Sequence, residues 1–272
     1  MSKPGNNFTE LAGVPVNYDR LAPPHNYGTR GIPTRFHTTA EFQDKLDACF
    51  SELWTACPLG QAETITSAGA YTAKPGYHGR GRAFDLDCIF WGDRTFVTSE
   101  YPTDAKFYLG VESIVRKYFG TVLSYNYNAS HRDHFHIDDG TDIGFRKVRS
   151  IVLFTQAALT DIYDDPVEID GQYGSETADA LDRVLATINI ETDLSQTTNW
   201  LSFLSATAAR AFDLATKTVA DDTKNPLELL NDLYGVIERE LADSESRKRI
   251  ETVLNRFAGH QETEVWLEGY RG

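Results

Sequence analysis

Two short segments constrain this chain most, residues 77–87 and 131–138, because each combines strand-like alternation with clustered histidine and aspartate. The second segment contains the run His-Phe-His-Ile-Asp at 134–138. Side chains of a β-strand point to opposite faces in turn, so the two histidines and the aspartate are predicted to share one face. The phenylalanine and the isoleucine are predicted to lie behind them in a core.

The first segment contains a second strand, predicted over 82–90, which follows a loop rich in glycine. Alternation predicts two faces: Phe84, Leu86 and Cys88 on one, and Asp85, Asp87 and Ile89 on the other. His78 lies in the loop, where Gly79 and Gly81 give the backbone the freedom to double back. His78 is therefore expected to approach Asp85, seven residues further along the chain.

These residue types are the ones that zinc binds. Zinc takes histidine nitrogen and carboxylate oxygen, and a catalytic site uses three protein ligands and keeps one position open. We predict His78 and Asp85 as two of the ligands. Either His136 or His134 supplies the third, because both are expected to point into the same space.

A hydrolytic site also needs a proton acceptor near the metal. His134 is one candidate. Asp133 is another, although strand alternation turns it away from His136. His131 is expected to orient its neighbours or to contact the substrate, if the turn before the strand brings it back.

Other chemistries have less support in the sequence. The chain has no Gly-x-Ser-x-Gly motif, and its three cysteines, Cys49, Cys57 and Cys88, fit no zinc or redox spacing. They can form one disulfide and one free thiol, or remain three buried thiols. Nucleic acid is not an expected partner, because binding phosphates needs a basic face. The formal charge is −14, and residues 151–272 hold 23 acidic and 10 basic side chains.

The chain is predicted to have three parts. Residues 1–36 are rich in Pro, Gly and Asn and are expected to form an irregular arm packed on the first domain. Residues 37–148 form that domain, with one helix starting at Thr38-Thr39-Ala40 and another over 104–119 that Gly120 caps. Residues 149–272 are expected to be helical, with helices over 151–163, 175–185, 200–214 and 226–257.

Neither membrane insertion nor secretion is signalled by the sequence. No window is apolar enough for a transmembrane helix, and the N-terminus has no apolar stretch of a secretory signal. If the protein acts outside the cytoplasm, we expect export by another route, delivery by a dedicated machine, or a signal already removed.

The two segments resemble a known family. Residues 118–123, Tyr-Phe-Gly-Thr-Val-Leu, and residues 127–138, Tyr-Asn-Ala-Ser-His-Arg-Asp-His-Phe-His-Ile-Asp, are similar to the bacterial extensin-like C-terminal family. Cys57-Pro58 and the preceding helix fit the same family, so that the resemblance covers roughly residues 30–145. The order of His78, Asp85 and the His-x-His pair also resembles zinc peptidases, namely the D-Ala-D-Ala carboxypeptidases, the murein endopeptidases and the related hedgehog domain.

The resemblance implies an α+β fold, in which a small, mainly antiparallel sheet flanked by helices holds one zinc ion. It implies His78, Asp85 and His136 as the ligands, His134 as the base or transition-state stabiliser, and His131 as its helper. Peptidoglycan stem peptide or its cross-link is the implied substrate. An arginine often holds the substrate carboxylate in such enzymes, and three are candidates: Arg80, Arg82 and Arg35.

One position departs from the carboxypeptidase branch of these peptidases. That branch typically has a glutamate three residues before the last ligand, and this chain has Asp133 there. The resemblance therefore does not extend to carboxypeptidase-type base chemistry.

A weaker resemblance lies in residues 154–181. The turn Asp170-Gly171-Gln172-Tyr173-Gly174 before a helix is similar to the Asp-Gly-x-x-Gly-x-x-Thr turn of a peptidoglycan-binding helical module. Both resemblances point to the same substrate. The expected function is a zinc-dependent, monomeric peptidase of D,D- or L,D-type that cleaves peptidoglycan stem peptides or cross-links in the periplasm or outside the cell. The alternatives are a non-catalytic, zinc-stabilised wall-binding module, and a delivered wall-degrading effector or lysin.

Overall fold

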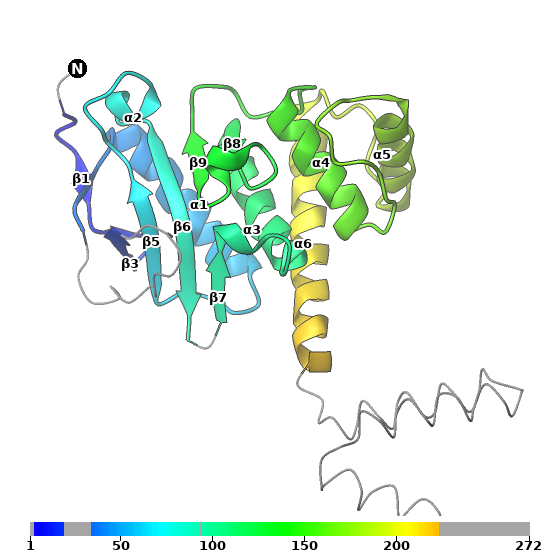
Figure 1. Ribbon diagram of the computed structural model, residues 1–272, viewed down its shortest axis with the longest axis horizontal. Coiled ribbons are helices and arrows are strands. Elements are labelled where there is room, and N and C mark those ends of the chain that lie inside the picture. The colour runs from blue at the N-terminus through cyan, green and yellow to red at the C-terminus, as the bar shows by residue number, and fades with distance from the viewer. Residues whose placement is uncertain (1–2, 19–33, 93, 223–272) are drawn as a thin grey trace, which may run out of the picture. The chain divides into compact units, whose positions relative to one another are not determined.

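The computed structural model describes residues 3–18, 34–92 and 94–222 (Figure 1). Met1–Thr216 pack as one compact unit. Lys217–Gly272 form a second unit, of which the structure describes only the end of the last helix. The helix predicted over 226–257 lies outside the described residues.

The centre of the first unit is a mixed sheet. Its strands run in the order β2 (Glu10–Leu11), β3 (Val14–Tyr18), β5 (Thr64–Gly69), β6 (Ala83–Trp91), β9 (Phe135–Asp138) and β8 (Thr121–Leu123). A further strand, β7 (Arg94–Val97), pairs with β6, and β1 (Asn7–Phe8) pairs with β4 (Phe36–His37) in a separate ladder. Among the described strands, β3 and β5 alone pair in parallel, which confirms the mainly antiparallel sheet of an α+β fold.

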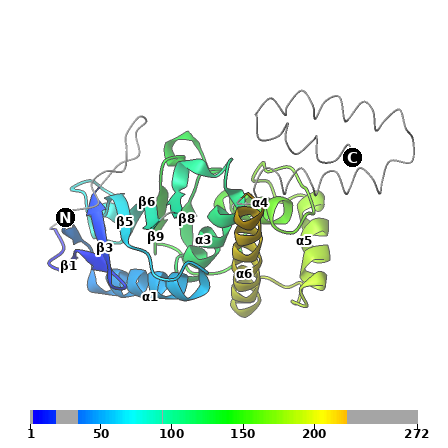
Figure 2. The same ribbon diagram turned by 90° about the horizontal axis from the view of Figure 1, so that it is seen from below.

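Two helices, α1 (Ala40–Ala56) and α3 (Ala105–Tyr118), cover one face of this sheet (Figures 1 and 2). The first begins as predicted, because the Thr39 side chain accepts a hydrogen bond from the backbone N–H of Phe42. Its apolar stripe is buried, and Phe135 of β9 packs edge-on against Tyr108 of α3. The apolar side chains of β6 and β9 therefore face the helices, which leaves the polar side chains of 134–138 for the opposite face.

Strand β6 departs from the predicted alternation at one residue. Thr66 of β5 pairs with Cys88, but the next residue of β5 pairs with Leu86, so Asp87 is an extra residue in a β-bulge. The predicted faces of Cys88 and Ile89 are therefore wrong. Ile89 joins the main core together with Leu86, whereas Cys88 packs with Phe90 and Val97 in a separate cluster.

Gly120 does not cap α3, contrary to prediction. The C-cap is Phe119, whose N–H bonds to the carbonyl of Val115. Gly120 lies where the backbone after β9 passes closely, and a Cβ atom there would lie 2.2 Å from the carbonyl oxygen of Thr141. A glycine is needed for this close approach rather than for ending the helix.

Within the described part of the chain, three helices follow the sheet: α4 (Arg149–Asp161), α5 (Ser175–Thr187) and α6 (Thr197–Asp222). They occur where the sequence predicts them, and Phe212 of α6 packs edge-on against Phe107 of α3 with ring centroids 5.4 Å apart. The division into 37–148 and 149–272 stays a prediction about independent folding, although both parts contribute to one compact unit up to Thr216.

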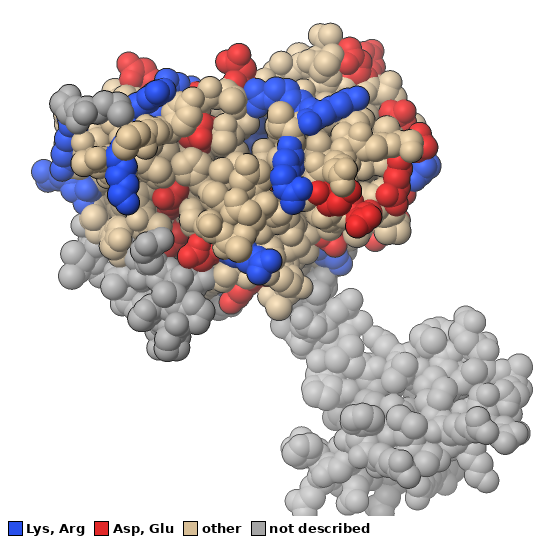
Figure 3. Space-filling view, turned by 45° about the horizontal axis from the view of Figure 1, so that its top comes forward, with Lys and Arg blue, Asp and Glu red and all other residues tan. Residues whose placement is uncertain are grey.

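The described acidic residues of the C-terminal part lie on the surface, and the cysteines follow the second of the two predicted alternatives, three buried thiols. Figure 3 shows acidic side chains gathered at the end that carries α5, where Glu176, Asp179 and Asp182 are exposed. All three cysteines are free and buried, and burial raises the pKa of the Cys57 thiol to about 11. No helix among the described residues is long and apolar enough to cross a membrane.

Candidate metal centre

The pairing of β6 with β9 positions two of the predicted ligands. Asp85 and His136 are register partners, so their side chains project from neighbouring strands on the face opposite the helices. His78 reaches them from α2 (Tyr77–Arg80), a single helical turn where the sequence predicts a pliable loop. Gly81 ends this turn at φ 68°, and a Cβ atom there would lie 3.2 Å from the backbone of Thr38.

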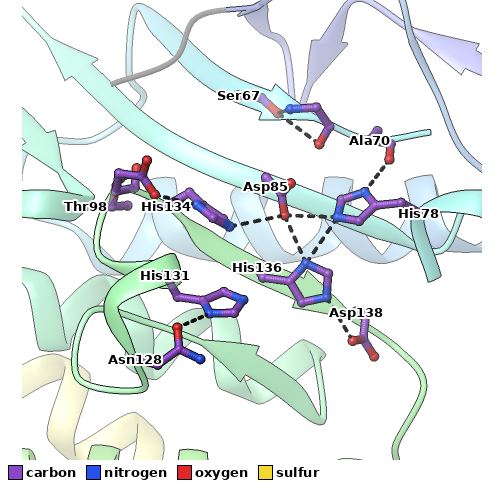
Figure 4. A network of polar contacts seen from close by, with 12 residues as sticks. Ser67, Ala70, His78, Asp85, Thr98, Asn128, His131, His134, His136 and Asp138 are labelled. Carbon is purple, nitrogen blue, oxygen red and sulfur yellow. Dashed lines mark hydrogen bonds and ion pairs between the residues drawn. The ribbon is translucent and has the colours of Figure 1, made fainter. Parts of the chain in front are cut away.

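The structure brings the three predicted ligands together (Figure 4). Asp85 Oδ1 lies 3.2 Å from His78 Nε2 and 3.0 Å from His136 Nδ1. The two ring nitrogens are 3.2 Å apart. Each of the three side chains remains 16–20% exposed, so a ligand can still reach the cluster from solvent.

Acceptors outside the triad hold the opposite nitrogen of each ring. His78 Nδ1 donates to the carbonyl oxygen of Ala70, and His136 Nε2 faces Asp138 Oδ2 at 3.2 Å. Because a neutral imidazole carries one hydrogen, these bonds leave His78 Nε2 and His136 Nδ1 with lone pairs toward Asp85. Outer acceptors of this kind orient metal-binding histidines in proteins.

This donor set fits a zinc ion. Three lone-pair atoms that face one another at 3.0–3.2 Å repel unless a cation or a proton lies among them. Two ligands of a tetrahedral zinc, each about 2.0–2.1 Å from the metal, lie about 3.3 Å from one another. The observed triangle is close to that size, and two imidazoles with one carboxylate are a common ligand set of catalytic zinc.

In the metal-free protein a proton takes the cation's role. Burial, the largest single influence on His136, lowers its pKa, but hydrogen bonds with Asp138 and Asp85 outweigh it and raise the pKa to about 9. Burial likewise raises the pKa of Asp85, and the hydrogen bonds from His136 and His78 outweigh it, so this pKa lies well below its usual range. His136 is therefore a cation between two carboxylates, and a metal ion must displace its proton.

His134 lies beside the triad, with Nε2 3.9 Å from Asp85 Oδ1. Its other nitrogen, Nδ1, is 2.8 Å from Asp133 Oδ1. Asp133 therefore contacts His134 directly. Both residues precede β9, which begins at Phe135 and not at His134 as predicted, so strand alternation does not apply to them.

His131 completes the group of histidines, from the last residue of η2 (Ala129–His131). Its Nδ1 is 2.8 Å from Asn128 Oδ1, and its ring centroid is 5.2 Å from that of His134. Burial, followed by repulsion from His134 and His136, lowers the pKa of His131 to about 4. His131 is therefore neutral near pH 7 in the metal-free protein.

The predicted substrate-binding arginines differ in their surroundings. Arg82 is committed to Asp139, with Nε 2.7 Å from Oδ1 and Nη2 2.9 Å from the backbone oxygen. Arg80 is exposed and lies over the Tyr77 ring, 5.2 Å from its centroid, without a hydrogen bond or ion pair to any described residue. Arg35 is also exposed and precedes β4.

Sequence reasoning did not identify Ala70, Asn128 or Thr98 as part of the site. Ala70 acts through a backbone carbonyl, which has no sequence signature. Asn128 had a usable signal, because asparagine often caps a short turn by accepting a backbone N–H, here that of Ser130. Thr98 holds the backbone oxygen of Asp133 at 2.8 Å, from a segment distant in sequence.

Comparison with known proteins gives one match. Residues 63–148 match the family described as extensin-like protein C-terminus. This segment is less than half of the chain, and it contains all three triad residues as well as His131 and His134. Cys57-Pro58 and α1, which also suggested the family, lie before it. No curated protein and no solved structure matches the chain.

Proposed function

We propose that the chain is a zinc-dependent peptidase that hydrolyses peptidoglycan stem peptides or their cross-links. One observation carries the proposal: lone pairs from His78, Asp85 and His136 converge at 3.0–3.2 Å with a further histidine beside them. The extensin-like match over 63–148 and the resemblance of the triad to zinc peptidases support the substrate class.

Each site residue has a part in amide hydrolysis. When bound, zinc supplies a Lewis acid that activates water and polarises a carbonyl group. His78, Asp85 and His136 would hold it, while Ala70 and Asp138 fix the two rings. Partial burial of the triad lowers the local dielectric below that of water, which strengthens the electrostatic stabilisation of developing charge.

His134 handles the proton in this proposal. Its Nε2 lies on the triad side, 3.9 Å from Asp85 Oδ1, within reach of a water between them. His131 keeps its ring against that of His134 and adds no positive charge that would repel a metal ion.

The surrounding charges suggest how a wall peptide binds. Arg80 lies in α2 with His78, and its guanidinium has no hydrogen bond or ion pair with a described residue, so it is the proposed partner of a substrate carboxylate. Arg82 is the weaker candidate, because Asp139 already occupies it. Because peptidoglycan lies outside the cytoplasmic membrane, we propose that the protein acts in the periplasm or outside the cell. The helices after residue 148 are proposed to bind the wall, and the protein is proposed to act as a monomer.

The test is digestion of purified peptidoglycan sacculi, with released fragments identified by mass spectrometry. Zinc-loaded protein is expected to release peptides, and chelation is expected to stop the release. Asp85→Asn should lose both zinc and activity, since one of three ligands changes from an anion to an amide. Asp44→Asn is the matched control, because Asp44 is exposed on α1, and it should keep both.

Two results would contradict the proposal. One is a digestion in which the zinc-loaded protein leaves the sacculi unchanged. If the protein nevertheless sediments with the sacculi, it is a wall-binding module. The other is activity that survives complete removal of the metal. Fragment masses also identify the cleaved bond, because carboxypeptidase action removes a terminal residue and endopeptidase action separates cross-linked stems.

A further inference from the structure

We infer that Asp133 is a positioning residue that acts through His134, fixing the tautomer in which Nε2 is the proton acceptor. The inference rests on the proposed function, and it distinguishes between the two roles that His134 could have, base or hydrogen-bond donor. Asp133 Oδ1 lies 2.8 Å from His134 Nδ1. An ionised carboxylate can only accept, so Nδ1 carries the hydrogen and Nε2 keeps the lone pair.

The backbone of Asp133 and His134 is held in place on both sides by buried residues. Thr98, which is fully buried, donates its hydroxyl to the backbone oxygen of Asp133 at 2.8 Å. Phe135, the next residue after His134, is buried and starts β9. Asp133 and His134 therefore lie between two fixed points, so the 2.8 Å hydrogen bond between their side chains costs little additional conformational entropy.

Asp133 stands on the outer side of the imidazole. Its side chain is 45% exposed, against 13% for His134. Among the described residues its carboxylate pairs with His134 and with none of the three triad side chains. The two nitrogens of the His134 ring face different groups: Nδ1 lies 2.8 Å from the Asp133 carboxylate, and Nε2 lies 3.9 Å from Asp85 Oδ1. The geometry suits action through the ring rather than on the attacking water.

His134 alone can carry the transferred proton through both steps of the reaction. As the water oxygen bonds to the amide carbon, the carbonyl π pair moves onto the carbonyl oxygen and one water proton moves to His134 Nε2. As the carbonyl group re-forms and the carbon–nitrogen bond breaks, the same proton passes from Nε2 to the leaving amine. Asp133 keeps the hydrogen bond from Nδ1 throughout and stabilises the imidazolium that forms between the two steps, as the aspartate does in serine-protease triads.

The kinetic test is a double-mutant cycle on sacculi digestion by the zinc-loaded full chain. Asp133→Asn and His134→Gln are each expected to slow peptide release by roughly 10²–10⁴-fold, the usual range for acid–base catalysis. The double variant is expected to be no slower than His134→Gln, because Asp133 has no route to the substrate without the ring. Asp133→Glu should recover part of the rate. Independent losses that multiply would show that Asp133 takes the proton itself, and would overturn the inference.

A second readout does not depend on turnover. In zinc-loaded protein with ¹⁵N-labelled histidine, His134 is expected to show hydrogen on Nδ1 in the wild type. Asp133→Asn should move hydrogen toward Nε2, because an amide can donate to Nδ1, while zinc content stays unchanged. An unchanged tautomer, or loss of zinc, contradicts the inference. If sacculi are never cleaved, the proposed function fails, but the measurement of the His134 tautomer still tests the role of Asp133.

Discussion

The charge state of His136 controls how readily the site takes a metal ion. This ring lies 3.0 Å from Asp85 Oδ1 and 3.2 Å from Asp138 Oδ2, and the two carboxylates raise its pKa to about 9 against the effect of burial. His78 and His134 also face Asp85, at 3.2 and 3.9 Å from its Oδ1, so three imidazole rings surround this carboxylate. A raised histidine pKa stabilises the metal-free fold fully below pH of about 6.5, and the contribution is lost as pH rises through about 9.

Zinc and the proton compete for His136, and this competition can be measured by calorimetry. At pH 7, zinc binding is expected to release about one proton, because His136 must become neutral before it can ligate. Asp85 adds none, since its pKa is already low and it is ionised. Titrations in two buffers with different ionisation enthalpies measure the number of protons directly. The affinity should also rise with pH until about pH 9.

Asp138→Asn provides the control for that measurement. It removes one of the two carboxylates that raise the pKa of His136, so fewer protons should be released at pH 8. Zinc binding without proton release at pH 7 in the unaltered chain would contradict the assignment of His136 as a ligand.

The alternation of β6 and β9 could be predicted from sequence, because the side-chain period of a strand depends only on backbone geometry. It placed Asp85 and His136 correctly on one face. It failed after Asp87, because a bulge depends on how β5 pairs, and the pattern of β6 alone carries no sign of it. The outer partner of His78 could not be predicted either, since the Ala70 carbonyl reaches it only in the folded chain.

The connection between α3 and β8 makes a prediction about stability. Gly120→Ala would place a methyl group 2.2 Å from the Thr141 oxygen and 2.4 Å from that of Asp142, both in the backbone. Neither atom can move without displacing the segment after β9, so the free energy of unfolding should fall by about 1–3 kcal/mol. Denaturant titration of the zinc-free chain measures this. Gly5→Ala is the control, because no atom lies within 4 Å of the added methyl, and equal midpoints for both variants would disprove the close contact.

Over the whole of the first unit, helix periodicity predicted which segments are helical but not which of them pack together. The predicted boundary after residue 148 follows a shift in composition, yet contacts cross it. Arg116 of α3 donates to the Ser150 carbonyl at 2.9 Å, and its guanidinium lies over the ring of Phe154 in α4. Gly110 of α3 leaves room for the Phe212 ring of α6, because a Cβ atom there would lie 2.6 Å from it. A hydrophobic stripe does not reveal its partner.

These contacts predict how two fragments differ. A fragment that ends at Thr216 keeps the entire first unit and should bind zinc with the affinity of the full chain. A fragment that ends at residue 148 exposes the surfaces of α3, including Phe107, that α4 and α6 cover, and it leaves the buried Arg116 with one acceptor fewer. Each large apolar side chain that loses its cover costs about 1.5–3 kcal/mol, so the shorter fragment should be less stable by several such increments. Urea unfolding of both fragments, followed by zinc competition, measures the difference. Equal unfolding midpoints would show that the chain up to residue 148 folds independently of the helices that follow it, and that the contacts of α3 with α4 and α6 contribute little to holding the triad in place.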